Sequence, residues 1–385
     1  MSTANQPPSR PAQRIQYAFT EEQEQFRSTL RRFLEDKSPP TEVRRLMATA
    51  EGYDPAVWRQ LSEHLGLPGI HLPQEYGGAG FGMVELGIVT EELGRALLCA
   101  PFFSTAVLAA NAIMNAATEE QKAALLPDLA AGAHLAALAL TELDGNWDPD
   151  AIQFRASASG GGYVLDGTKS YVVDGHIANL LVVAARLAGD KVALFTTASD
   201  GGGITRELLQ SMDPTRKLAR IDFKSARAQL LGGEDGRAAL GRTLDQAAVA
   251  LANEMVGGAQ KLLESAVSYA KMRVQFGRPI GSFQAIKHKL ADMLVDVELA
   301  KSAAYYAAQA AAVEDPEWPA LASMAKAAAS DAYVRTAAET IQIHGGIGFT
   351  WDNDTHLWFK RAKSSEVFLG QPNYHRELLM QRWEV

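Results

Sequence analysis

Two hydrophobic periods follow each other along the chain. In the first third, apolar residues recur at helical spacing, as in Phe26, Leu30 and Leu34 after the capping box Thr20–Gln23. From about residue 133 the period becomes strand-like, and it stays so to about residue 232. The pattern predicts helices followed by a β region.

The last third returns to a helical period in alanine-rich segments. We expect helices over about 241–273, 282–312, 317–344 and 355–382. Four long helices with short connections predict an antiparallel four-helix bundle. The predicted fold is therefore α+β and mainly α, with these parts: a flexible N-terminal tail (1–15), a helical domain (16–132), a middle antiparallel β-barrel-like domain (133–235) and a C-terminal four-helix bundle (236–385).

Turn residues divide the β region. Asp166-Gly167, between Tyr163–Leu165 and Tyr171–Val173, predicts a β-hairpin. Gly189-Asp190 predicts a second turn, between strands over 180–187 and 191–197.

The stretch Tyr269–Met293 predicts a break between two helices. Pro279 cannot continue a helix, and Gly277 suits a left-handed C-cap. We expect Arg273 and Gln275 on the last turn of the first helix, beside Phe276, and Ser282 as the N-cap of the second. A guanidinium, an amide and a ring at one corner suit an anionic, aromatic ligand. The alternative is an ordinary helical hairpin with a solvated arginine.

Composition narrows the class of protein. The chain has 385 residues and a net charge of −8, which argues against a nucleic-acid surface. Its single cysteine, Cys99, lies in an apolar run, which excludes an internal disulfide and indicates a small buried residue. No apolar run is long enough to span a bilayer, and the N-terminus lacks an apolar signal core. We expect a cytoplasmic enzyme without a metal.

The domain order and several motifs together resemble the acyl-CoA dehydrogenase family over nearly the whole chain. The motifs are LPQEYGGAG (72–80), Leu140-Thr141-Glu142, Gly167-Thr168-Lys169, Arg273–Pro279 with Gln284, and QIHGGIG (342–348). The resemblance implies FAD-dependent removal of two hydrogens from the α and β carbons of an acyl-CoA thioester. It also implies an oligomer, and electron-transfer flavoprotein or a similar acceptor as the redox partner.

The resemblance assigns two segments to FAD. Arg273 would pair with phosphate, Phe276 would pack near the adenine, and Gln275 and Gln284 would donate or accept hydrogen bonds. In the QIHGGIG motif, Gln342, Gly345 and Gly346 would let backbone amides approach phosphate closely. The family uses both segments to reach the FAD of a neighbouring subunit. The alternative for the glycines is a helix terminator alone.

The flavin-ring and substrate positions depart from the family pattern. Thr141 and Tyr171 remain as expected ring contacts, but Val173 replaces a threonine. Trp147 stands where a serine contacts the acyl-CoA in relatives, so we treat it as a substrate-side position.

The catalytic base is missing from its usual place. The family's glutamate aligns with Leu369, and the minority position in the first bundle helix aligns with Ala247. A carboxylate is needed there because it must take the α proton. The remaining candidates are Glu254, Asp245 and Glu366, and for each the alternative is a solvated or structurally paired acid. Asp245 also matches an acidic position near the CoA arm in relatives.

Three hypotheses follow. In the first, this chain completes the FAD adenine site of a base-bearing paralogue in an α2β2 assembly, as in bacterial relatives acting on steroid-derived CoA thioesters. In the second, a homo-oligomer uses a relocated acid, Glu254 or Asp245. In the third, the chain is a structural subunit, or an oxygenase or reductase on the same scaffold.

Overall fold

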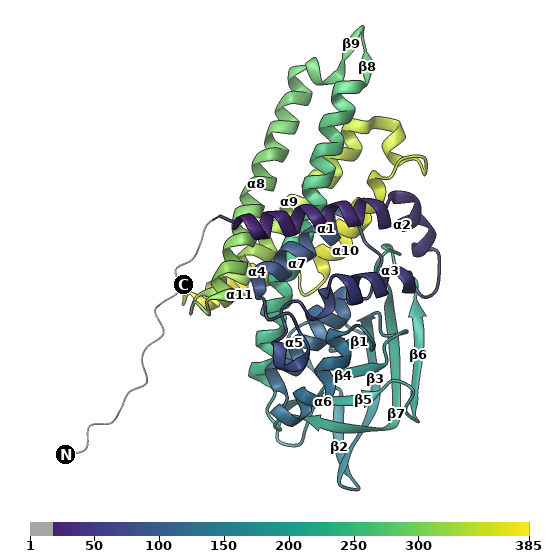
Figure 1. Ribbon diagram of the computed structural model, residues 1–385, viewed down its shortest axis with the longest axis vertical. Coiled ribbons are helices and arrows are strands. Elements are labelled where there is room, and N and C mark those ends of the chain that lie inside the picture. Colours follow the sequence, from purple (N-terminus) through teal and green to yellow (C-terminus); the bar gives the residue numbers. More distant parts are fainter. Residues whose placement is uncertain (1–17, 385) are drawn as a thin grey trace, which may run out of the picture.

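The computed structural model describes residues 18–384, so the predicted tail (1–15) lies outside the described residues. The long helices fill the upper part of the molecule, and the sheet lies in the lower part with shorter helices beside it (Figure 1). The predicted mainly helical α+β fold is confirmed. No helix among the described residues is long and apolar enough to cross a membrane.

The first third is helical, as its apolar period predicts. Thr20 and Thr118 both form complete capping boxes, and the Asp54 carboxylate accepts from the amides of Ala56 and Val57. The helices are α1 (Glu21–Lys37), α2 (Pro40–Met47), α3 (Pro55–Arg59), α4 (Met83–Ala96), α5 (Ala110–Ala116) and α6 (Glu119–Ala130). A π-helical segment, η4 (Phe103–Ala109), leads directly into α5.

The sheet contains seven strands. They are β1 (Ala136–Ala139), β2 (Arg155–Ser159), β3 (Gly162–Val173), β4 (Leu180–Arg186), β5 (Val192–Ala198), β6 (Ile204–Leu209) and β7 (Leu218–Leu231). Pairing runs from β4 through β2, β3, β7 and β5 back to β4, which is the basis for its barrel-like shape. The predicted pair β4–β5 is confirmed, but β1 lies parallel to β4, so the sheet is mixed rather than purely antiparallel.

The predicted hairpin at Asp166-Gly167 is wrong. β3 passes straight through this position as one strand, with a bulge between Leu165 and Gly167 in its pairing with β7. Gly167 has a φ of +128°, and a Cβ there would lie 3.0 Å from the ring of Phe154. The glycine therefore serves a bulge and a close packing contact, not a turn. The actual turn, at Gly160-Gly161, joins β2 to β3.

The C-terminal third is a helical bundle. Its helices are α7 (Arg237–Met272), α8 (Gln284–Ala312), α9 (Trp318–His344), α10 (Thr355–Val367) and α11 (Pro372–Arg382). Two of them, α7 and α8, pack on α4. α4 and α7 cross at glycines: a Cβ on Gly94 would lie 2.0 Å from the Glu254 carbonyl oxygen, and one on Gly257 would lie 1.9 Å from that of Glu91. This close crossing places the middle of α7 against the N-terminal helices.

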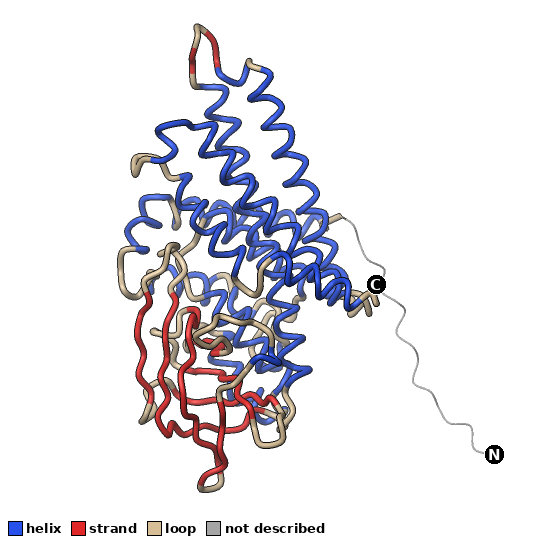
Figure 2. The backbone as a smooth tube through the Cα atoms, turned by 180° about the vertical axis from the view of Figure 1, so that it is seen from behind, coloured by secondary structure: helices blue, strands red, loops and turns tan. Residues whose placement is uncertain are grey.

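The predicted break between two helices is confirmed, but the placement of Gln275 on the last helical turn and of Ser282 as an N-cap is wrong. α7 ends at Met272, and the next residues form a two-stranded hairpin, β8 (Val274–Gln275) and β9 (Arg278–Pro279), at the far tip of the bundle (Figures 1 and 2). Ser282 does not cap α8, whose N-cap is Phe283 without a side-chain bond. The reason is that Phe276 and Gly277, at φ of +53° and +77°, form a tight hairpin turn instead of a helix C-cap.

The predicted helix 355–382 is also interrupted. It breaks between α10 and α11, where Leu369 and Gly370 have φ of +62° and +103°. Pro372 then begins α11, because proline suits the first helical turn. The expected base position therefore lies in a sharp turn.

Candidate active site

The hairpin at the tip of the bundle, residues 273–279, is exposed, and its side chains make few contacts with the rest of the described residues. Every residue from Lys271 to Pro279 is exposed, and Phe276 is 92% exposed. The Arg273 guanidinium makes no hydrogen bond or ion pair with residues 18–384, while Gln275 bonds only the adjacent Val274 carbonyl, at 2.7 Å. An exposed aromatic with free cationic and amide groups suits a contact outside this chain.

The glycine-rich segment lies at the same end of the bundle as the hairpin. Tyr269, near the end of α7, stacks on His344 at the end of α9, with ring centroids 4.2 Å apart. Beyond His344 comes a 3₁₀ turn, η7 (Gly345–Phe349), in which Gly345 and Gly346 are exposed and have open space around their Cα atoms. Gln342 and Gln284 are exposed as well. The structure thus places the predicted adenine-side and phosphate-side residues on neighbouring helix ends.

The positions expected beside the flavin ring are committed to internal contacts. The Thr141 hydroxyl donates to the Ser170 carbonyl oxygen at 2.5 Å, and Thr141 is buried. Tyr171 has a φ of +57°, and its hydroxyl donates to the Leu143 carbonyl oxygen at 3.4 Å. Val173 is buried and offers no hydrogen-bonding group.

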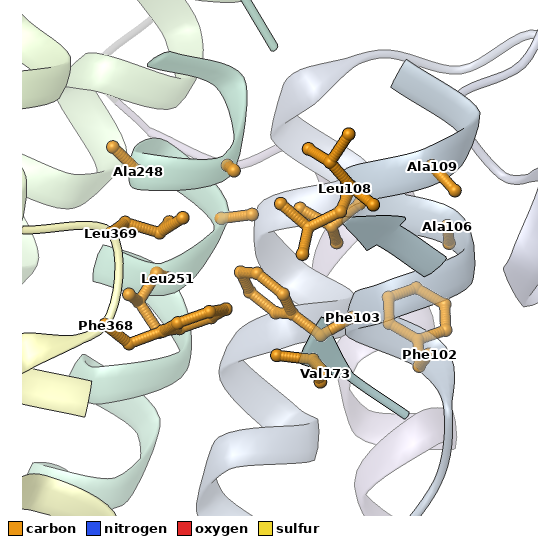
Figure 3. Close-up of a cluster of buried hydrophobic side chains, with 14 of the residues drawn as sticks. Phe102, Phe103, Ala106, Leu108, Ala109, Val173, Ala248, Leu251, Phe368 and Leu369 are labelled. Atoms are coloured by element: carbon orange, nitrogen blue, oxygen red, sulfur yellow. The ribbon is translucent and has the colours of Figure 1, made fainter. Parts of the chain in front are cut away.

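Aromatic side chains fill the space next to Val173. Phe103 from η4 and Phe368 from the α10–α11 turn face each other across it, with ring centroids 5.4 Å apart (Figure 3). Trp147 packs edge-on against Phe368 at 5.1 Å, and Leu369 is 3% exposed. These side chains fill the interior where the resemblance would place the flavin ring and the thioester.

A buried charge network completes this closure. Arg216 lies over the rings of Phe103 and Phe368, 5.3 and 4.9 Å from their centroids. Its Nη2 donates to Glu254 Oε1 at 2.5 Å, and Arg361 Nη1 donates to the same oxygen at 3.1 Å. Arg361 is held in turn by Asp213, with Nε 2.8 Å from Oδ2. The network joins the β6–β7 loop, α7 and α10.

Little free volume remains at this junction. The pocket here has about 30 Å³ of free volume and is lined partly by Val173, Asp174, Arg216 and Glu254. A cavity of this size and polarity has room for about one water molecule. The Asp174 carboxylate accepts from the Ser104 hydroxyl at 2.7 Å, and burial raises its pKa to about 6.

Neither Glu254 nor the aligned family positions offer a free base. The Glu254 carboxylate is buried and already accepts hydrogen bonds from Arg216 and Arg361, so it is not free to approach a substrate. Ala247 is fully buried and Leu369 is apolar, so neither can accept a proton. Glu366 pairs with Lys363 one turn away on α10.

Asp245 is also paired, but it lies in a surface cleft. Both of its oxygens accept from Arg382 Nη2, at 2.8 and 3.0 Å, and burial raises its pKa to about 6. The cleft has a volume of about 220 Å³, and Trp147, Leu369 and Tyr374 line it together with Asp245. The structure thus brings the two predicted substrate-side residues, Trp147 and Asp245, to the same cleft, next to Leu369.

The closing residues were not among those predicted from the sequence. Arg216, Arg361, Phe103 and Phe368 carry no motif of their own. The available signal was local: Arg361 follows Leu357 and Trp358 at helical spacing, and a charged residue on the apolar face of a helix often indicates a buried pair.

FAD, the cofactor implied by the resemblance, fits only one of the two places. The exposed corner offers a free guanidinium, an unstacked ring and open glycine backbone, which suit a pyrophosphate and an adenine. The interior beside Val173 is filled by this chain's own side chains and does not fit an isoalloxazine ring.

Comparisons with known proteins agree across the chain. Residues 20–133 match the model of the acyl-CoA dehydrogenase N-terminal domain, and residues 234–383 match that of the C-terminal domain. The acyl-CoA dehydrogenase IpdE2 of Mycobacterium tuberculosis is 38% identical, over 94% of this chain and 98% of its own.

Solved structures share the fold. A chain of a variant of the Tcur3481-Tcur3483 steroid ACAD superposes with a TM-score of 0.86 at 31% identity, over 94% of this chain and 98% of that one. Butyryl-CoA dehydrogenase from Megasphaera elsdenii gives 0.89 at 28% identity, over 96% and 99%. The chain belongs to the acyl-CoA dehydrogenase family, oxidoreductases that act on the CH–CH bond of acyl-CoA with FAD.

Proposed function

We propose that this member of the acyl-CoA dehydrogenase family is the subunit that completes the FAD site of a base-bearing paralogue. The observation that supports this most is the contrast between its two half-sites. The adenine and pyrophosphate half is exposed and free, whereas the flavin-ring half is filled by Phe103, Phe368 and Arg216.

The division of labour follows from the side chains. Bound FAD supplies the acceptor for the β hydride of the thioester. In this chain, Arg273 would bind pyrophosphate, Phe276 would cover the adenine, and the amides near Gly345 and Gly346 would receive phosphate oxygens. The partner would provide the carboxylate that takes the α proton, because Leu369 and Ala247 cannot.

The substrate class is proposed from a relative. The Tcur3481-Tcur3483 protein is a steroid ACAD, and its name joins two components. We therefore expect a CoA thioester of a steroid side chain or ring remnant, an α2β2 assembly and electron-transfer flavoprotein or a similar acceptor.

Co-expression tests the proposal. We would purify this chain alone and with a neighbouring paralogue that carries the family glutamate, then measure flavin absorbance per chain and its bleaching by steroid-derived acyl-CoA without oxygen. We expect little FAD and no bleaching for the chain alone, and one FAD per pair of chains in the active complex. A fully loaded and active single chain would overturn the proposal.

One observation favours a second candidate, a homo-oligomer with Asp245 as base. Asp245 lines a cleft with Trp147 and has a raised pKa of about 6. In that case the single chain would show flavin bleaching, and Asp245→Asn would abolish it. The two-subunit proposal instead expects no bleaching by the single chain, with or without this substitution.

A further inference from the structure

The turn at the expected base position is held by a buried lysine from another helix. Lys326 of α9 is fully buried, and its Nζ donates to the carbonyl oxygens of Ser365 at 3.1 Å, Glu366 at 2.9 Å and Gly370 at 2.9 Å. It also lies 3.1 Å from Ser330 Oγ. Every ammonium proton therefore has an oxygen acceptor.

Two of these carbonyls belong to the last turn of α10, and the third closes the following turn. A cation at a helix C-terminus meets both unpaired carbonyl oxygens and the negative end of the helix dipole. Lys326 therefore links the end of α10 to Gly370, across Phe368 and Leu369.

The linked turn has a backbone that needs such support. Leu369 is a non-glycine residue with a φ of +62°, a conformation that costs about 1–2 kcal/mol for an L residue. Its carbonyl oxygen lies 2.9 Å from His375 Nε2, and His375 is buried as well. Two buried donors, from α9 and α11, thus fix the three residues 368–370.

We infer that Lys326 is a positioning residue that holds the Phe368–Gly370 turn in place as a latch and thereby keeps the interior beside Val173 filled. The latch acts through Phe368, whose ring contacts Phe103, Trp147 and Arg216. The inference rests on the proposed function in one respect: if this interior stays filled, the flavin ring must bind in the partner subunit. Its test needs neither flavin nor activity.

Thiol labelling measures the latch directly. Leu369→Cys would place a thiol in the turn, while the native Cys99, 2% exposed in the N-terminal domain, reports wider opening. In the purified full-length chain, we would follow labelling by a thiol reagent and assign the site by mass spectrometry. With Lys326 intact, the thiol introduced at position 369 should react slowly, as a buried thiol does.

Lys326→Met removes the donors and keeps the length of the side chain. We expect it to speed labelling at 369 at least about tenfold, the effect of losing roughly one charge-assisted hydrogen bond, with Cys99 unchanged. The matched control is Lys363→Met, which removes the ion pair between Lys363 and Glu366 within α10. It should leave the labelling rate at position 369 within about twofold of the rate with Lys363 intact.

His375→Phe is the second variant, in case Lys326→Met does not fold. It removes one neutral donor to Leu369, and we expect labelling at 369 to rise about two- to fivefold. Unchanged labelling at 369 in the folded variants, or equal acceleration at 369 and Cys99, would overturn the latch. If the complex with the paralogue binds no FAD while the labelling result holds, only the proposed function is contradicted.

Discussion

The exposed hairpin corner and the interior beside Val173 are the two ends of one expected cofactor site. They differ in whether their charged and aromatic side chains already have partners within this chain. At the corner, the Arg273 guanidinium has no partner among the described residues and Phe276 is 92% exposed. In the interior, Arg216 is 6% exposed, bonded to Glu254 and packed between two rings. One end is available to another molecule and the other is not.

This difference separates binding from chemistry. A free guanidinium can gain a charge-assisted bond to phosphate, whereas a paired one must first lose its partner. On the proposed function, the corner offers groups that suit a dinucleotide, while this chain's own side chains fill the interior where the reactive ring was expected. Four substitutions test this contrast.

The largest expected effect comes from the interior. Glu254→Ala would leave Arg216 and Arg361 buried without their shared carboxylate, so we expect the free energy of unfolding to fall by about 3–5 kcal/mol. Urea unfolding of the purified complex measures this. The control Glu264→Ala removes a half-exposed pair with Arg95 and should cost about 1 kcal/mol or less. Lost flavin bleaching with unchanged stability would instead make Glu254 the base.

The second prediction uses pH at the edge of the same cavity. Burial raises the pKa of Asp174 from 3.8 to about 6, so the folded chain holds this proton more tightly than the unfolded chain. The stability it contributes is complete below pH 4 and is lost as pH rises through 6. Asp174→Asn cannot ionise, so relative to the native chain it should gain at most about 3 kcal/mol between pH 4 and 8. Unfolding curves across that range measure the gain, and a parallel pH dependence for the exposed control Asp190→Asn would contradict the assignment.

The third prediction concerns the corner. Arg273→Ala should weaken FAD binding by the complex about 10- to 100-fold, because one charge-assisted phosphate contact is lost. Equilibrium dialysis or flavin fluorescence gives the dissociation constant. Arg220→Ala, which removes an arginine paired with Asp222 in the sheet, serves as control. Equal losses in the two variants would argue against a specific phosphate contact.

The smallest expected effect on folding is at Phe276. Its ring meets the edge of the Phe283 ring, with centroids 6.1 Å apart, and is otherwise open to solvent, so Phe276→Ala should change the unfolding free energy of the isolated chain by less than about 0.5 kcal/mol. FAD affinity of the complex should still fall about two- to tenfold through lost stacking. Phe81→Ala, at another exposed ring, is the control, and an equal effect on FAD there would rule out the adenine contact.

Local sequence chemistry was enough for much of the fold. The boxes at Thr20 and Thr118 and the cap at Asp54 predicted helix starts, because a capping bond joins residues two or three apart. The same reasoning failed at Gly167 and Gly277, since a left-handed glycine serves a bulge, a hairpin or a helix end equally well. Which of these forms depends on packing, such as the ring of Phe154 against Gly167.

For the candidate site, the sequence by itself determined which groups are present and which are missing. Arg273, Phe276 and the glycines at 345–346 could be named from their order, and Leu369 showed that the usual carboxylate is absent. These are properties of single positions.

Only the tertiary structure decided what those positions face. The partners of Glu254 lie 38 residues before it and 107 after it, and nothing local specifies that both guanidinium groups meet one carboxylate. The physical reason is that a charge removed from water must find its counter-charge among whichever elements the core brings together. Packing of the β6–β7 loop, α7 and α10 therefore pairs the candidate base Glu254 with two buried arginines, and it fills the interior where the sequence predicted a flavin ring.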